Sequence, residues 1–189
     1  MLPIGPLMVE HRIIERMIRT LGIRMERLRA EKEADPGFIE AVVHFFGAYA
    51  DRCHHGKEED ILFRALSRKD LSPGHVRLLA ELTEEHKQGR RAVTALADAN
   101  QAFLRGEPGA VSAIVEGLGW LVDFYPRHIE KEDKRFFIPV MDYFTREEKD
   151  AMIAQGDALD SRLLHQEFED LVRSVGPAKK YAKGDGPIY

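Results

Sequence analysis

Apolar residues recur every three to four positions along most of the chain, the spacing that places them on one face of an α-helix. Near the N-terminus one such face is shared by Leu7, His11, Ile14, Ile18, Leu21, Met25 and Leu28. No segment shows a convincing alternation of apolar and polar residues of the kind that indicates a β-strand. The pattern therefore predicts an all-α protein.

Gly, Pro and capping residues divide this pattern into five helical segments. "ADPG" ends the first segment, with Asp35 as an N-cap and Pro36 at the first position of the next helix. Within the break "DLSPGH", Ser72 is the expected cap of the next helix. Thr145 with Glu148 forms a capping-box pattern at the start of the last segment. The expected helices cover about residues 6–33, 36–67, 73–105, 108–137 and 145–175.

Four long helices joined by short breaks predict an up-down-up-down four-helix bundle. We assign residues 1–144 to this bundle and residues 145–189 to an appended helix followed by an irregular C-terminal tail, which is rich in Gly, Pro and Lys. The additional C-terminal helix could cap the bundle, pack against it or form a homo-oligomer. The sequence leaves these alternatives open.

Composition and charge narrow the class of protein. The 189 residues suit one domain with an appendage, and the apolar share of 44% is enough for a core. A net charge of −4 argues against nucleic acid and anionic membranes as partners. No apolar run approaches the roughly 20 residues that cross a bilayer, and no signal peptide is apparent, so we expect a cytoplasmic protein. With Cys53 as the single cysteine, an intrachain disulfide and a cysteine-ligated iron–sulfur cluster are excluded.

Two charged stretches repeat one pattern directly before an apolar run. They are "HHGKEEDILF", which starts at His54, and "HIEKEDKRFF", which starts at His128. Each histidine is followed four residues later by a glutamate, Glu58 or Glu132, so the two side chains share one helix face. An imidazole and a carboxylate in this arrangement can bind the same cation. A single His-x-x-x-Glu pattern is usually part of a solvent-exposed helix surface.

The first and third expected helices each add a histidine, His11 and His86. In an alternating bundle these residues lie near the same end as the repeated pattern, with His86 somewhat deeper. Four imidazoles and two carboxylates are too many for one simple site, but they suit two transition metals bridged by the two glutamates. A cation pair also offsets the cost of burying the carboxylates. The combination favours metal binding.

These motifs resemble the hemerythrin-like, or HHE cation-binding, family. The resemblance covers about residues 7–140 and rests on "EHRIIERM", "HHGKEEDILF", "EEHKQGRR" and "HIEKEDKRFF". It implies two iron ions with an oxo or hydroxo bridge, although manganese or zinc suits the same ligand types. By resemblance, four histidines are terminal ligands and two glutamates are bridges: His11, His54, His86, His128, Glu58 and Glu132.

The family spacing selects His54 rather than its neighbour as the ligand. His55 is then expected outside the ligand set or facing solvent, together with Glu59 and Asp133. The alternative pair, His55 with Glu59, has the same spacing of four residues. Two further acids, Glu10 and Glu85, directly precede ligand histidines and are expected on the exposed surface.

The third helix departs from the oxygen-carrying members of the family. Those proteins have two histidines four residues apart, and Leu82 stands at the earlier position here. One iron is therefore expected to lack a histidine, which Tyr125, Glu15 or a water could replace. This difference weakens the expectation of reversible oxygen carriage.

The resemblance favours a protein that binds or senses oxygen or a related small molecule, such as peroxide or nitric oxide. A di-iron enzyme acting on peroxide or nitric oxide and an iron storage or handling protein are the alternatives. Ferritin-like bundles use Glu-x-x-His pairs, and none of the eight histidines has a glutamate three positions before it. His-Glu-x-x-His is also absent, which argues against a zinc protease of that type.

Overall fold

The computed structural model of the chain describes residues 2–31 and 34–175. The helical elements in chain order are α1 (Ile4–Glu31), α2 (Pro36–His44), η1 (Phe45–His55), η2 (Glu58–Phe63), α3 (Arg64–Leu66), α4 (Pro73–Leu104), α5 (Ala110–Lys131), η3 (Glu132–Phe136), α6 (Phe137–Val140), η4 (Met141–Tyr143) and α7 (Arg146–Val175). This described part contains no β-strand, which confirms the all-α prediction.

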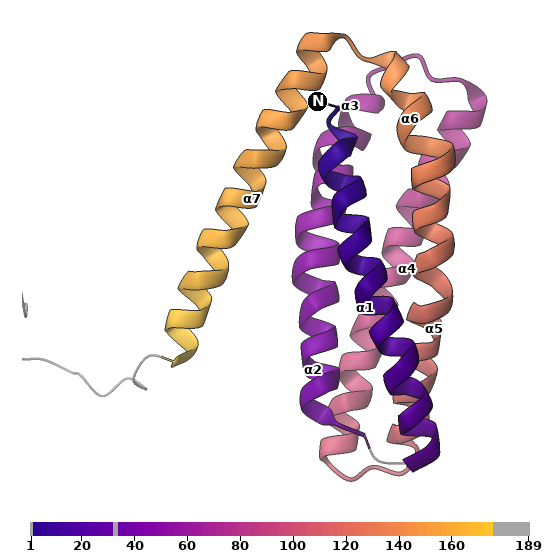
Figure 1. Ribbon diagram of the computed structural model, residues 1–189, viewed down its shortest axis with the longest axis vertical. Coiled ribbons are helices and arrows are strands. Elements are labelled where there is room, and N and C mark those ends of the chain that lie inside the picture. Colours follow the sequence, from indigo (N-terminus) through magenta and orange to yellow (C-terminus); the bar gives the residue numbers. More distant parts are fainter. Residues whose placement is uncertain (1, 32–33, 176–189) are drawn as a thin grey trace, which may run out of the picture.

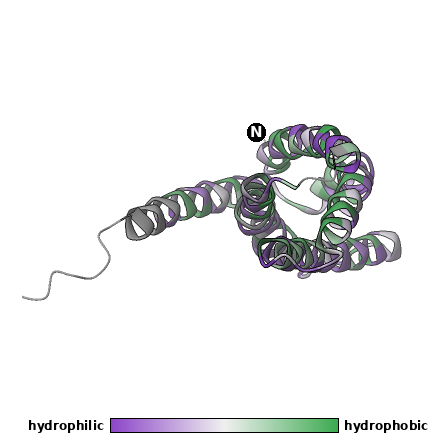
Figure 2. Ribbon diagram, turned by 90° about the horizontal axis from the view of Figure 1, so that it is seen from below, coloured by the Kyte–Doolittle hydropathy of each residue, from purple (hydrophilic) through white to green (hydrophobic). Residues whose placement is uncertain are grey.

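Four long helical columns form the body of the molecule (Figure 1). They are α1, the run from α2 through α3, α4, and the run from α5 through α6. The chain direction alternates from one column to the next, as the colours of Figure 1 show. α5 contacts both α1 and α4, and α4 contacts α2, so the columns surround a common axis (Figure 2). The predicted helical bundle is confirmed.

Capping side chains begin three of the helices at the positions that the sequence indicated. Asp35 Oδ1 accepts a hydrogen bond of 3.1 Å from the amide three residues later, and Ser72 Oγ accepts one of 3.3 Å in the same way. Before α7, Thr145 and Glu148 exchange side chain–backbone hydrogen bonds of 2.9 and 3.2 Å. Each cap satisfies an amide that has no partner within the helix.

Two apolar clusters fill the bundle, and a buried polar layer separates them. On α1, His11 lies between Leu7 of one cluster and Ile14 of the other. On the second column, the same transition falls between Ala50 and Leu62. The columns therefore bring ionisable side chains to one level of the bundle, with apolar residues above and below.

Two of the columns change from α-helical to π-helical hydrogen bonding where they cross this layer. η1 carries His54 and His55, η2 begins at Glu58, and η3 begins at Glu132. A π-helical turn is wider than an α-helical turn and is frequently found at functional sites. The apolar spacing of the sequence predicted helices here but did not distinguish the two forms.

α7 contacts the bundle through η1 and η2 and then extends away from it (Figure 1). Met152 and Leu159 are its buried apolar residues among those that the structure describes. The irregular tail expected after residue 175 lies outside the described residues, and a homo-oligomer through this helix stays a prediction. Within residues 2–31 and 34–175, no helix combines the length and apolar character needed to span a membrane.

Candidate metal centre

Seven ionisable side chains of the polar layer, contributed by all four columns, are almost completely buried. None is more than 2% exposed, and together we name them the seven-residue centre: His11, His54, His55, Glu58, His86, His128 and Glu132. Burying so many ionisable groups is unfavourable unless each finds a partner. The contacts of these seven side chains therefore indicate which kind of ligand the centre could bind.

Each of the five imidazoles has a carboxylate bonded to its Nδ1 atom. The pairs are His11–Asp133 at 2.7 Å, His54–Glu10 at 2.9 Å, His55–Asp51 at 3.3 Å, His86–Glu59 at 2.7 Å and His128–Glu85 at 2.8 Å. A carboxylate that accepts from Nδ1–H fixes the ring orientation and leaves Nε2 free to bind a cation. This is the arrangement that metal-binding histidines use.

The outer carboxylates are themselves paired with cations. Arg90 bonds to Asp51 at 2.7 Å and to Glu59 at 2.8 Å. The other pairs are Arg12–Asp133, Lys57–Glu10 and Lys131–Glu85. The charges around the centre are thus neutralised from outside, and the two inner glutamates have none of these cations as partners.

Inside the centre, the polar atoms lack hydrogen-bond partners. All five Nε2 atoms and all four carboxylate oxygens of Glu58 and Glu132 are buried and without a hydrogen bond. Leaving a buried polar group unsatisfied costs about 1–3 kcal/mol, so a whole set of them is not explained by the protein alone. Nitrogen and oxygen atoms converging in this way fit a bound metal cation.

The inward atoms fall into two groups that could each hold a metal ion. His11, His54, Glu58 and Glu132 form the first, and their ligand atoms lie within 4.8 Å of one another. The second group has three histidines within the same distance limit: His55, His86 and His128. All seven residues thus belong to one of the two groups.

The two glutamates span both groups. Glu58 Oε1 lies 3.5 Å from His54 Nε2, and Glu58 Oε2 lies 3.3 Å from His86 Nε2. Glu132 repeats this arrangement, with its two oxygens 3.1 and 3.3 Å from one histidine of each group. Each carboxylate therefore offers one oxygen to each group, as a bridging ligand does.

Burial and neighbouring charges shift the pKa values of three histidines in the centre. Burial, followed by repulsion from neighbouring histidines, lowers the pKa of His55 well below its usual value, so its ring is neutral as a ligand must be. Burial lowers the pKa of His11, but the Asp133 hydrogen bond and the close Glu132 carboxylate raise it to about 10. His86 is similar: carboxylates outweigh burial and raise its pKa to about 11. Without metal, His11 and His86 thus hold protons that a metal ion would have to displace.

The structure brings together all six residues that the sequence indicated as ligands, but His55 does not face solvent, which was one of its two expected positions. Its ring is buried and stacks on His86, with centroids 3.9 Å apart and planes 11° apart. His54 turns the other way, toward His11, at a centroid distance of 4.6 Å. The side chains of His54 and His55 both point inward because they leave η1 on either side of the direction toward the bundle axis.

His55 offers an imidazole to the second group in place of the histidine that is missing at Leu82. Leu82 is fully buried in an apolar cluster, and the third imidazole of the second group comes from η1 instead. Tyr125 lies in the other apolar cluster, where burial raises its pKa and keeps the phenol protonated. Glu15 is 30% exposed and pairs with Arg12 at 3.2 Å. Glu15 belongs to neither ligand group of the described residues.

Sequence reasoning largely missed the outer carboxylates that bond to the histidines. Glu10 and Glu85 were expected on the exposed surface, yet they bond to His54 and His128. Each precedes one histidine in sequence but contacts a histidine of another column, so spacing along one helix carries no signal for it. Glu59 was expected outside the ligand set, and from that position it bonds to the imidazole of His86.

We expect His55→Ala to lower the affinity for metal by on the order of tenfold or more, the effect of losing even an outer partner of a ligand. The substitution removes one of the three imidazoles of the second group. A competition titration of the full chain with a chelator measures the affinity. His75→Ala is the control, because His75 bonds to Tyr143 away from the centre. Equal affinities of the two variants would restore the expected position of His55 outside the ligand set.

Comparison with known proteins agrees with the geometry. The family model described as the hemerythrin HHE cation binding domain matches residues 2–138, which include all seven residues of the centre. No curated protein and no solved structure showed a significant match to the chain. The family match covers more than half of the 189 residues. The chain therefore belongs to the hemerythrin HHE cation-binding domain family.

Proposed function

We propose that the seven-residue centre holds two iron ions bridged by Glu58 and Glu132, and that the protein uses them to bind or sense oxygen or a related small molecule. The observation that carries this proposal is the position of the two glutamates, each with one oxygen toward each ligand group. When bound, an iron pair supplies redox chemistry and an open coordination position. Manganese or zinc would suit the same nitrogen and oxygen ligands.

The two groups offer unequal numbers of protein ligands. The first provides two imidazoles and the second three, and the glutamates add one oxygen each to both. The ion held by His11 and His54 would have fewer protein ligands, so a small molecule has room on that side.

Apolar residues cover the same side of the centre. Phe137 stacks on His11 with ring centroids 5.5 Å apart and planes 8° apart. Leu7 and Leu62 lie one helical turn from ligand residues and belong to the apolar cluster above the centre. An apolar cover excludes water and charged solutes, which supports a small, nearly uncharged molecule such as oxygen or nitric oxide as the ligand.

The visible spectrum of the iron-loaded, anaerobically reduced protein, recorded before and after adding air, tests this proposal. We expect a new charge-transfer band that disappears again when oxygen is removed. A band that does not reverse would favour the alternative of an enzyme acting on peroxide or nitric oxide. No change on adding air, with two irons bound, would contradict oxygen binding and favour iron storage.

Stabilisation by metal should grow as the pH rises from about 6.5. The protonated His11 and His86 stabilise the metal-free fold fully below about pH 6.5, the usual pKa of histidine, and this contribution is lost as the pH rises through about 10 and 11. Metal must displace both protons, so acid favours the metal-free form. Melting temperatures with iron and with chelator should therefore differ more at about pH 8.5 than at about pH 6.5. An equal difference at both values would contradict this.

A further inference from the structure

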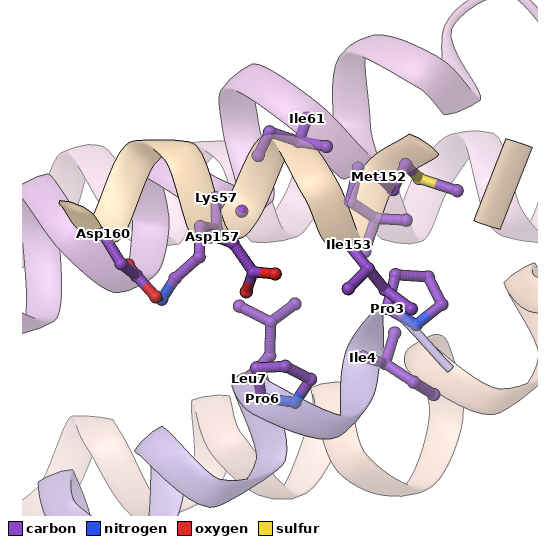
Figure 3. Close-up of a pocket in the computed structure, with 12 residues that line it drawn as sticks. Pro3, Ile4, Pro6, Leu7, Lys57, Ile61, Met152, Ile153, Asp157 and Asp160 are labelled. Atoms are coloured by element: carbon purple, nitrogen blue, oxygen red, sulfur yellow. The ribbon is translucent and has the colours of Figure 1, made fainter. Parts of the chain in front are cut away.

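α7 is held on the bundle by few contacts. A cavity of about 30 Å³ lies between α1, α7 and the second column, so the helix does not pack closely along its whole length. Figure 3 shows this cavity, with Asp160 of α7 and Lys57 of the second column pointing toward one another at one end. Lys57 Nζ donates to both Asp160 carboxylate oxygens, at 2.7 and 2.9 Å.

Lys57 is the one buried Lys or Arg among the side chains that the structure describes. A buried ammonium is unfavourable unless carboxylates pair with it. Its partners are Asp160 and Glu10 of α1, and Glu10 in turn bonds to His54 Nδ1 at 2.9 Å. These four residues form one connected chain, the Asp160–His54 relay, from the surface helix to the centre.

This relay differs from the other outer contacts of the centre. The cations that hold the other outer carboxylates are Arg12, Arg90 and Lys131, which lie within the four columns. In the described structure, only the Glu10–Lys57 pair continues to a residue of α7. The three ligand atoms of Glu10, Cys53 and Asp160 also lie close together, but the Lys57 ammonium bonds to both acids and neutralises them. A second cation at that place is therefore not favoured.

We propose that Asp160 is a positioning residue for the metal centre: through Lys57 and Glu10 it orients His54, so that docking of α7 raises the affinity of the centre for metal. This inference rests on the proposed metal binding. Without Asp160, Lys57 depends on Glu10 alone and competes with His54 for that carboxylate. His54 then has a weaker partner on Nδ1, which loosens its ring and lowers its strength as a ligand.

Linkage makes the effect reciprocal. If docking of α7 raises metal affinity by some factor, metal must favour the docked helix by the same factor. Coupling between two sites typically corresponds to about 5–150-fold, and the relay has two residues between Asp160 and the ligand. We therefore expect an effect of about fivefold, at the lower end of this range.

Two substitutions of full-length protein test the relay, Asp160→Asn and its matched control Asp157→Asn. Both remove one charge from α7 without changing side-chain size, and Asp157 is exposed on the same helix. Ferrous ion is titrated anaerobically against a competing chelator. We expect Asp160→Asn to weaken binding about fivefold and Asp157→Asn to leave it unchanged. Asp160→Glu keeps the carboxylate and should recover much of the loss.

Hydrogen exchange of the wild-type chain gives a second readout that does not depend on a variant. Amides around Asp160 should exchange about fivefold more slowly with ferrous ion bound, and Asp160→Asn should abolish this slowing. Equal ferrous affinities of Asp160→Asn and Asp157→Asn would overturn the relay while leaving metal binding intact. Hydrogen exchange in α7 at the same rate with and without ferrous ion would do the same. A wild-type chain that binds no ferrous ion would instead overturn the proposed function and, with it, the relay.

Discussion

Replacing Glu132 with alanine will remove most of the iron from the protein. Glu132 has one oxygen toward each ligand group, so its loss takes a ligand from both ions at once. The substitution also leaves an unbalanced positive charge, because Glu132 stabilises the imidazolium of His11. Since loss of an outer partner alone costs about 10–100-fold in affinity, loss of a bridging ligand should cost more. Iron content of the purified variant, measured by elemental analysis, gives the result.

Glu130→Ala is the matched control for this experiment. Glu130 lies two residues earlier on the same column, its side chain is 59% exposed, and it pairs with Lys134 at 2.7 Å. The control should retain the iron content of the wild-type protein. An iron content of Glu132→Ala equal to that of Glu130→Ala would mean that this carboxylate is not a ligand.

Removing the metal will lower the melting temperature by about 10 °C. The nine inward atoms without hydrogen bonds are the five Nε2 atoms and four glutamate oxygens, and bound cations would satisfy them together. Metal at about 1,000 times its dissociation constant stabilises the folded state by about 4 kcal/mol. A chain of this size shifts its melting temperature by about 2–4 °C for each kcal/mol, so the total is about 8–16 °C.

Far-ultraviolet circular dichroism during heating, with iron and with chelator, measures this difference. Glu132→Ala should show almost no difference between the two conditions, because it cannot hold the metal. A wild-type protein that melts at the same temperature with and without iron would contradict a contribution of metal to stability.

The sequence predicted the bundle closely because its signals are local. Asp35 and Ser72 cap helices at the expected positions, and the apolar spacing gave the helical segments between them. The expected third helix, about residues 73–105, corresponds to α4 over Pro73–Leu104. Caps and apolar faces depend on residues a few positions apart, which a sequence displays directly.

The missed residues depend on contacts between columns. His55 was placed outside the ligand set because the family spacing selected His54, whereas η1 directs both rings toward the axis, to opposite neighbours. Glu10 and Glu85 bond to histidines 44 and 43 positions away in the chain. Asp160 is 103 residues from Lys57. A single sequence carries no spacing rule for such pairs, although the His-His doublet itself was a signal for two inward rings.

The most direct test of the central claim is the iron stoichiometry of the full chain. Metal-free protein is titrated anaerobically with ferrous ion, and bound iron is counted against protein concentration. Two ligand groups joined by two bridging glutamates predict a plateau at two irons per chain. A plateau at one iron per chain, or no binding, would contradict the two-metal centre.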